Sequence, residues 1–222
     1  MTEKKFGERH DGFFITFEGP EGAGKTTQLQ LLREYLESAG HDCVMTREPG
    51  GTVIAEQLRA LVKHHNSGEV MSDETELLLI AAGRAQHVRN LIIPALNAGK
   101  VVLCDRFFDS TTAYQGYARG IDLDFVRRLN RFACCGCIPD LTILFDISPE
   151  EGFARASVRV STMNVADRIE AAGIEFHRRV YEGFRQIAAA EPERVKTVAA
   201  SGSPDEIKQH IKGIVDHAFK NL

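Results

Sequence analysis

The chain has 222 residues, 43% hydrophobic and 26% charged, which is enough for one α/β domain with the balance of a soluble globular protein. Its net charge of −4 argues against binding nucleic acid, because nucleic-acid binders normally carry a basic surplus. We find neither a secretory leader nor an apolar run near the roughly 20 residues that cross a bilayer, and the odd cysteine count does not suit a disulfide scaffold. We therefore expect a cytoplasmic protein that binds no membrane.

Short β-rich runs alternate with helical stretches along the chain, a pattern typical of a parallel sheet covered by helices. The run 101–104 is apolar throughout, as expected of a strand buried on both faces. The predicted strands are 13–17, 43–46, 101–104, 141–146 and 195–198. The predicted helices are 26–39, 53–63, 74–97, 124–134, 149–158, 170–190 and 204–220. We expect one α/β domain over residues 1–222, with three layers, a five-stranded parallel sheet and a short lid at about residues 155–168.

The strongest motif is G-x-x-x-x-G-K-T at residues 19–26, directly after a predicted strand and before a predicted helix. Its glycines let backbone N–H groups turn toward phosphate oxygens, and the positive end of the helix adds to the attraction. Lys25 would reach the β- and γ-phosphates, and the Thr26 hydroxyl would bind Mg²⁺. The residues predicted to bind ATP are Gly19, Pro20, Glu21, Gly22, Ala23, Gly24, Lys25, Thr26 and Thr27. A glycine-rich turn without a nucleotide is the less favoured alternative.

The second metal ligand, beside Thr26, is expected to be an acid at the end of a buried strand, and Asp105 follows the run 101–104. Capping of the next segment is the alternative for Asp105.

The guanine-reading Asn/Thr-Lys-x-Asp motif of GTPases does not occur, whereas arginines are frequent. Arginine binds phosphate bidentately, and a nucleotide phosphate is already anionic near pH 7 because its second pKa is about 6. Such an acceptor needs positioning more than a general base, so the pattern indicates a nucleoside monophosphate kinase.

Several motifs together resemble the thymidylate kinase family. They are FEGPEGAGKTT at 17–27, REPGGT at 47–52, DRF at 105–107, AYQG at 113–116 and DRIE at 167–170, and the similarity covers about residues 13–190. The resemblance implies a P-loop NTPase fold and transfer of the ATP γ-phosphate to dTMP with Mg²⁺, bound by Thr26 and Asp105. It also implies a homodimer packed through helices.

The resemblance further implies which residues act on the transferring phosphate. The implied catalytic residues are Lys25, Asp105, Arg106 and Arg159. Because Gly22 stands where one subclass of the family has an arginine, the missing charge should come from the lid. The lid arginines are Arg155, Arg159 and Arg168, and a solvated basic face is the alternative reading of them.

The residues implied to bind dTMP are Glu21, Arg47, Ile80, Arg84, Arg106, Thr111, Tyr114 and Gln115. By resemblance, Glu21 would accept a hydrogen bond from the 3′-hydroxyl, while Arg47 and Arg106 would bind the acceptor phosphate. Arg84 and Thr111 would contact the thymine. Tyr114 would lie against the sugar and favour a deoxynucleotide. A solvated helix charge is the alternative for Arg84, and a plain core position is the alternative for Tyr114.

Ile80 departs from the family pattern, in which a phenylalanine usually stacks on the base. Base–aromatic stacking contributes about 1–3 kcal/mol in nucleic-acid complexes, so we expect weaker dTMP binding or looser base choice. Another pyrimidine monophosphate or a deoxynucleoside therefore stays open as the acceptor. A non-catalytic nucleotide sensor is a further alternative, which the intact Lys25, Asp105 and Arg106 disfavour.

The cysteines Cys134, Cys135 and Cys137 stand close together. A zinc site would normally pair such a group with two further ligands elsewhere, and we find no such pair in the sequence. Buried thiols are therefore the preferred reading.

Overall fold

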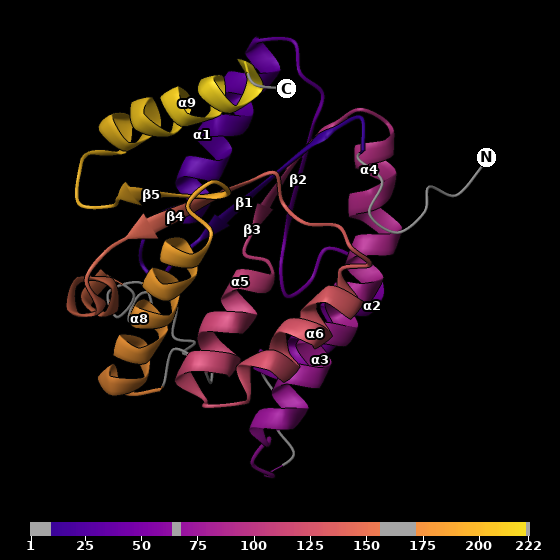
Figure 1. Ribbon diagram of the computed structural model, residues 1–222, viewed down its shortest axis with the longest axis vertical. Helices are drawn as coiled ribbons and strands as arrows, with labels where there is room; N and C mark the ends of the chain where they lie inside the picture. The colour runs from indigo at the N-terminus through magenta and orange to yellow at the C-terminus, as the bar shows by residue number, and fades with distance from the viewer. Residues whose placement is uncertain (1–9, 64–67, 156–171, 221–222) are drawn as a thin grey trace.

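The computed structural model describes residues 10–63, 68–155 and 172–220 (Figure 1). Five strands form one sheet in the order β2-β3-β1-β4-β5, and every neighbouring pair is parallel. The strands are β1 (Phe13–Glu18), β2 (Cys43–Arg47), β3 (Val101–Asp105), β4 (Leu141–Asp146) and β5 (Val195–Ala199). The predicted five-stranded parallel sheet is confirmed, with strand ends shifted by at most one residue.

The strand register brings the carboxyl ends of β1, β2 and β3 to one level. Asp105 at the end of β3 lies opposite Phe17 of β1 on one side and Arg47 of β2 on the other. Ligand sites of parallel α/β sheets lie outside the carboxyl ends of the strands. This edge is therefore where the segments after β1, β2 and β3 can act together.

Helices cover both faces of the sheet (Figure 1). They are α1 (Lys25–Ser38), α2 (Val53–Lys63), α3 (Asp73–His87), α4 (Ile93–Asn97), α5 (Phe108–Thr111), α6 (Leu123–Ala133), α8 (Ile174–Ala190) and α9 (Pro204–Lys220). Two π-helical segments, η1 (Val88–Ile92) and η2 (Thr112–Ala118), join α3 to α4 and extend α5. Another helix starts at residue 149 and is described as far as residue 155. No helix in these described ranges is long and apolar enough to span a membrane.

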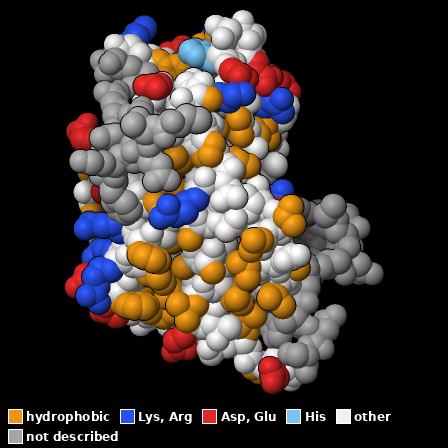
Figure 2. Space-filling model, turned by 90° about the vertical axis from the view of Figure 1, so that its right-hand side faces the viewer, with side chains coloured by type: hydrophobic (Ala, Val, Ile, Leu, Met, Phe, Trp, Pro, Cys, Tyr) orange, Lys and Arg blue, Asp and Glu red, His pale blue; other side chains and the backbone are white. Residues whose placement is uncertain are grey.

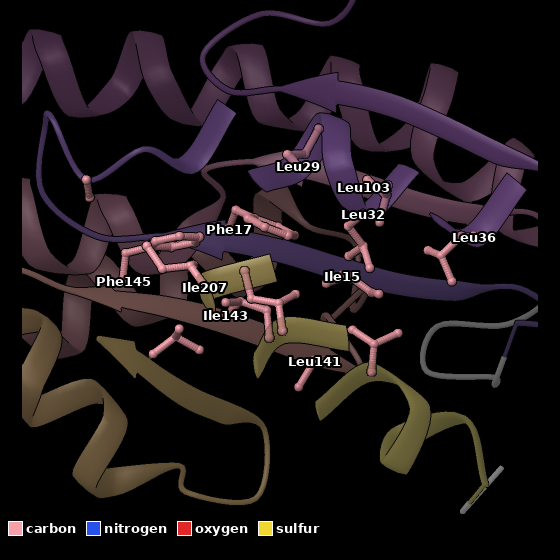
Figure 3. Packing of buried hydrophobic residues seen from close by; sticks show 14 of the residues in the cluster. Ile15, Phe17, Leu29, Leu32, Leu36, Leu103, Leu141, Ile143, Phe145 and Ile207 are labelled. Carbon is pink, nitrogen blue, oxygen red and sulfur yellow. The ribbon is translucent and has the colours of Figure 1, made fainter. Parts of the chain in front are cut away.

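One face of the sheet packs against α1 and α9. The side chains of β1 alternate in direction, so Ile15 and Phe17 point to this face and contact the α1 residues Leu29 and Leu32 (Figure 3). Ile207 brings α9 into the same cluster. All of these side chains are at most 8% exposed, so this layer is a continuous apolar core.

The opposite face of the sheet packs against the other helices. Phe14 of β1 and Val102 of β3 lie in a cluster with Val88 and Ile92 of η1. Toward β4, Leu144 lies with residues of η2 and α8. A bidentate ion pair between buried Asp109 and Arg194, with N–O distances of 2.7 and 2.9 Å, ties α5 to the turn before β5. The start of α5 is thereby fixed next to the sheet edge.

The cysteines follow the expectation of buried thiols. Cys134 and Cys137 are buried beside Cys104 in the core under α4, and Cys135 is half-buried. Burial raises the pKa of the Cys137 thiol to about 12. Such thiols remain protonated and behave as small apolar side chains.

The helix predictions differ from the structure at three places. The predicted helix 74–97 is helical throughout but contains a π-helical turn in η1. The predicted helix 170–190 is too long, because Gly173 is extended and α8 starts only at Ile174. The segments α5 and η2 were not predicted, although they carry part of the candidate site.

Candidate active site

The loop between β1 and α1 wraps around the Lys25 side chain. Lys25 Nζ donates to the carbonyl oxygens of Gly19 at 3.1 Å and Pro20 at 2.7 Å. Gly24, in a left-handed conformation, precedes α1 without a side-chain cap, so the first N–H groups of the helix face the loop. Burial, and then the neighbouring Arg106 charge, lower the pKa of Lys25 to about 8. A buried cation and uncapped helix N–H groups together form an anion-binding site.

Thr26 and Asp105 lie together, as predicted for metal ligands. The Thr26 hydroxyl donates to Asp105 Oδ2 at 2.7 Å. Both are hard oxygen ligands of the kind Mg²⁺ prefers, so this pair fits the predicted ion. The described residues contain no group of three His, Cys, Asp or Glu side chains able to hold a metal. Protein Mg²⁺ sites in kinases usually use one or two protein ligands beside substrate phosphates and water, and one hydroxyl with one carboxylate suits such a site.

Arg106 lies between the phosphate-binding loop and η2. Its backbone has a φ of 68°, which is left-handed and unusual for a residue with a side chain. The guanidinium donates to Glu21 Oε1 at 2.7 Å, to the Gly19 carbonyl at 2.9 Å and to Ser110 Oγ at 3.0 Å. It also lies over the ring of Tyr114, 5.2 Å from the centroid. The structure thus brings together Glu21, Arg106 and Tyr114, three of the residues implied to bind dTMP.

Glu18, which the sequence analysis missed, determines where Arg106 lies. This fully buried carboxylate accepts hydrogen bonds from the Phe107 N–H at 2.7 Å, the Ser110 N–H at 3.2 Å and the Ser110 hydroxyl at 2.5 Å. It therefore caps α5, whose own N-cap residue makes no side-chain hydrogen bond. Burial, and then the charge of Asp109, raise the pKa of Glu18 to about 7.

Arg84 lies at the other end of the site and is only 2% exposed. Its Nε donates to Glu48 Oε2 at 2.7 Å, its Nη1 to Asn130 Oδ1 at 2.9 Å and its Nη2 to Thr111 Oγ1 at 2.9 Å. The alternative that Arg84 is a solvated helix charge is therefore wrong. A buried guanidinium with three anchored N–H groups has a fixed direction, which suits recognition of a planar ligand.

Glu48 is the carboxylate that anchors this arginine. Its second oxygen, Oε1, accepts from Nδ1 of buried His87 at 3.0 Å, and His87 Nε2 lies 2.7 Å from Thr46 Oγ1. A Cβ at Gly51 would lie only 2.4 Å from His87 Nε2, and Gly51 has a φ of 89°. The second glycine of REPGGT is thus required by the close approach of the loop to this histidine.

Tyr114 and Gln115 come from η2, and Ile80 comes from α3. The ring of Tyr114 packs near Phe176 and Phe184, while its buried hydroxyl makes no hydrogen bond of normal geometry to a described residue. Burial raises the pKa of this hydroxyl well above its ordinary range. Gln115 Nε2 donates to Glu76 Oε1 at 2.9 Å. A π-helical turn in this position is typical of functional sites.

A cavity of about 480 Å³ connects these groups. Its lining residues that the sequence analysis predicted are Glu21, Gly22, Ala23, Gly24, Lys25, Thr26, Thr27, Arg47, Ile80, Arg84, Asp105, Arg106, Thr111, Tyr114, Gln115 and Arg155. Gly19 and Pro20 do not line it, and they bind the Lys25 ammonium with their carbonyls instead. Lining residues that were missed are Glu48, Pro49, Arg59, Lys63, Phe107 and Ser110.

The arginines Arg47 and Arg59, which line the cavity, already make hydrogen bonds within the protein. Arg47, with a side chain 52% exposed, donates from Nη2 to both carboxylate oxygens of Glu56, at 2.9 and 3.0 Å. Arg59 Nη1 donates to the Pro49 carbonyl at 2.7 Å. Arg59 and Lys63 stand four residues apart on α2, so they share one helix face, and this spacing could have identified them.

Arg155 is the lid arginine that the structure describes. It lines the cavity and donates to the Ala200 carbonyl at 3.0 Å and to Glu151 at 2.6 Å. Arg159 and Arg168 lie outside the described residues.

Comparison with known proteins gives consistent matches over most of the chain. The family model described as "Thymidylate kinase" matches residues 17–211. A curated thymidylate kinase of Synechococcus sp. (strain JA-2-3B'a(2-13)) is 52% identical over 203 residues, covering 91% of this chain and 94% of its own length. One of Bacillus velezensis is 44% identical over 211 residues, covering 95% and 98%. The crystal structure of thymidylate kinase from Ehrlichia chaffeensis is similar with a TM-score of 0.73 at 33% identity, covering 92% and 98%.

The raised pKa of Glu18 predicts a pH-dependent effect of Glu18→Gln. A carboxyl whose pKa rises from 4.5 to about 7 on folding contributes stability that is present below about pH 4.5 and is lost as the pH rises through 7. The variant cannot ionise, so its free energy of unfolding relative to the wild type should rise between pH 5 and pH 8. Urea unfolding at both pH values measures this difference. Glu193→Gln, at an exposed site, is the control, and a difference independent of pH for Glu18→Gln would contradict the burial of an ionisable group there.

Proposed function

The chain belongs to the thymidylate kinase family, and we propose that it uses this cavity to transfer the γ-phosphoryl group of ATP to dTMP, giving ADP and dTDP. One observation carries the proposal: a single cavity joins the phosphate-binding loop to a wall of buried polar side chains. The loop suits a triphosphate, and the wall, with Arg84 and Thr111, suits the edge of a nucleobase. A sensor of ATP alone would need only the first of these two ends.

At the donor end, the loop and Lys25 bind the ATP phosphates. Thr26 and Asp105 would hold Mg²⁺, which would supply screening of the charge that builds up on the phosphates. Lys25 now donates to two carbonyls, and a phosphate oxygen can replace one of them. The negative phosphates also stabilise the charged form of Lys25, which burial disfavours in the free protein.

At the centre, Arg106 binds the phosphate of dTMP. A guanidinium has five N–H groups, and three of them bind Glu21, Gly19 and Ser110. The Nε–H and the second Nη2–H lie outside these three contacts and suit a bidentate phosphate. Because the attacking phosphate oxygen is already anionic near pH 7, the reaction requires alignment and charge screening and needs no separate base.

At the acceptor end, Arg84, Thr111 and Gln115 contact the base and Tyr114 lies against the sugar. Glu21 accepts a hydrogen bond from the 3′-hydroxyl. Arg47 reaches the acceptor phosphate after leaving Glu56, an exchange that is inexpensive because an exposed ion pair contributes only about 0–1 kcal/mol. The lid arginines Arg155, Arg159 and Arg168 close over the transferring phosphate, with Arg159 as the catalytic one.

We also propose that the protein works in the cytoplasm as a homodimer. Hydrophobic side chains gather on the face shown in Figure 2, and the helices α2, α3 and α6 pack beside one another there. The exposed large hydrophobic residues on and next to these helices are Val53, Ile54, Leu61, Leu78, Phe125, Phe132 and Ile138. An apolar surface of this extent favours association with a second copy of the chain.

The acceptor is tested by an ADP-release assay with ATP–Mg²⁺ against dTMP, dUMP, dCMP, UMP, AMP and thymidine. We expect the highest kcat/KM with dTMP, because the wall combines donors with an acceptor and Tyr114 excludes a 2′-hydroxyl. Lys25→Ala is the control and should lose turnover with every acceptor. A higher kcat/KM for another acceptor would identify that compound as the substrate of the same cavity. ATP binding without turnover of any acceptor would favour a nucleotide sensor.

The dimer is tested by sedimentation equilibrium. The wild type should sediment at twice the chain mass of 24.6 kDa, and Phe132→Glu should weaken the dimer at least tenfold, because Phe132 is 76% exposed on α6. Gln209→Glu, exposed on α9 across the sheet, is the matched control. A wild-type protein that stays monomeric, or equal effects of the two variants, would contradict this interface.

A further inference from the structure

Glu76 is a fully buried carboxylate on α3 that none of the roles above uses. Its Oε1 accepts from Gln115 Nε2 at 2.9 Å and from Arg119 Nε at 3.4 Å, and its Oε2 accepts from Arg119 Nη2 at 3.2 Å. Arg119 also pairs with Asp73 at 3.3 Å and lies over the ring of Phe176. Arg119 thus donates to both oxygens of this carboxylate, so Glu76 acts as a hydrogen-bond acceptor toward its neighbours.

A carboxylate that accepts from an arginine through both oxygens offers Gln115 only acceptors, and this determines how Gln115 is turned. The side-chain amide of glutamine has a donating NH₂ end and an accepting carbonyl end. Only the NH₂ end can bond to Glu76, so the orientation follows from chemistry and does not depend on telling nitrogen from oxygen. Gln115 lines the cavity, and its carbonyl Oε1 is thus the end left for a ligand.

The wall of the cavity therefore has a defined pattern of donors and acceptors. Arg84 offers only donors, and three of its five N–H groups are anchored by Glu48, Asn130 and Thr111. Gln115 offers an acceptor. A thymine presents an acceptor at O4 and a donor at N3, whereas a cytosine presents an amino donor at C4 and an acceptor at N3. The wall matches thymine at both positions and opposes cytosine at both.

We propose that Glu76 is a positioning residue for base choice: by fixing the Gln115 amide with its carbonyl toward the cavity, it makes the site prefer dTMP over dCMP. The inference rests on the proposed function of the cavity. If the side chain at position 76 no longer accepts the hydrogen bond from Gln115 Nε2, Gln115 can turn its NH₂ end to the ligand. It can then donate to the ring nitrogen of cytosine. A site that needs a buried hydrogen bond discriminates strongly, because the wrong ligand leaves polar groups unpaired.

The test measures kcat/KM of Glu76→Gln for dTMP and for dCMP. We expect the ratio of dTMP to dCMP to fall at least tenfold, mainly through the KM of the nucleotides, with the KM of ATP unchanged. If Glu76 had a merely structural role, Glu76→Gln would lower kcat/KM equally for dTMP and dCMP. An unchanged dTMP to dCMP ratio would therefore overturn the proposal. The wild-type arm tests the proposed function separately, since absence of dTMP turnover there would refute that function and not the role of Glu76.

Asp73→Asn is the matched control, because it removes the other carboxylate of Arg119 without touching Gln115. Its ratio should stay within twofold of the wild type, and a fall as large as that of Glu76→Gln would assign the effect to Arg119 and overturn the proposal. Glu76→Asp keeps an acceptor-only group and should keep the dTMP preference even where total activity drops. Loss of preference in this variant would also count against the proposal.

A second measurement shows whether Glu76 acts through Gln115. In a Gln115→Leu background there is no amide to orient, so adding Glu76→Gln should leave the dTMP to dCMP ratio unchanged. A further fall in the double variant, additive to that of Gln115→Leu, would mean that Glu76 affects base choice by another route.

Discussion

The cost of burying an unpaired charge is the constraint on which the candidate site depends. Arg84 is buried beside the cavity, and the carboxylate of Glu48 compensates its charge at 2.7 Å. Glu18 binds the turn that carries Arg106, and Glu76 binds Gln115. Arg84, Gln115 and the turn that carries Arg106 are therefore each fixed by a buried acid before any ligand arrives. Groups oriented in advance need not reorganise during the reaction, which is how fixed dipoles and charges contribute to catalysis.

The parallel sheet places these acids where they are needed. Glu18 ends β1 and Glu48 follows β2, and the register puts both strand ends level with Asp105 at the end of β3. The Asp109–Arg194 pair then fixes the start of α5 against the same edge. The phosphate-binding loop, the Thr26–Asp105 pair and the proposed acceptor site thus share one frame.

The sequence predicted the parts of the site that depend on local spacing. Lys25, Thr26 and Asp105 could be located because each has a fixed place relative to a strand and a loop. The partners could not be predicted: Glu18, Glu48 and Glu76 are ordinary glutamates in sequence and become anchors only through contacts with distant residues. The segment η2 lacked a helical pattern because its side chains pack against α8 and α6 in several directions and Gly116 interrupts it. The start of the predicted helix 170–190 was wrong, because Gly173 is extended and the sequence around it gives no sign of that conformation.

The most direct test of this account is a crystal structure with dTMP, Mg²⁺ and an ATP analogue that resists hydrolysis. The account predicts the dTMP phosphate on Arg106, the base edge on Arg84, Thr111 and Gln115, and the Glu48–Arg84 contact unchanged from the ligand-free protein. A dTMP molecule bound elsewhere would contradict it. So would a complex in which Arg84 leaves Glu48 to reach the ligand, because the acids would then not be what orients the site.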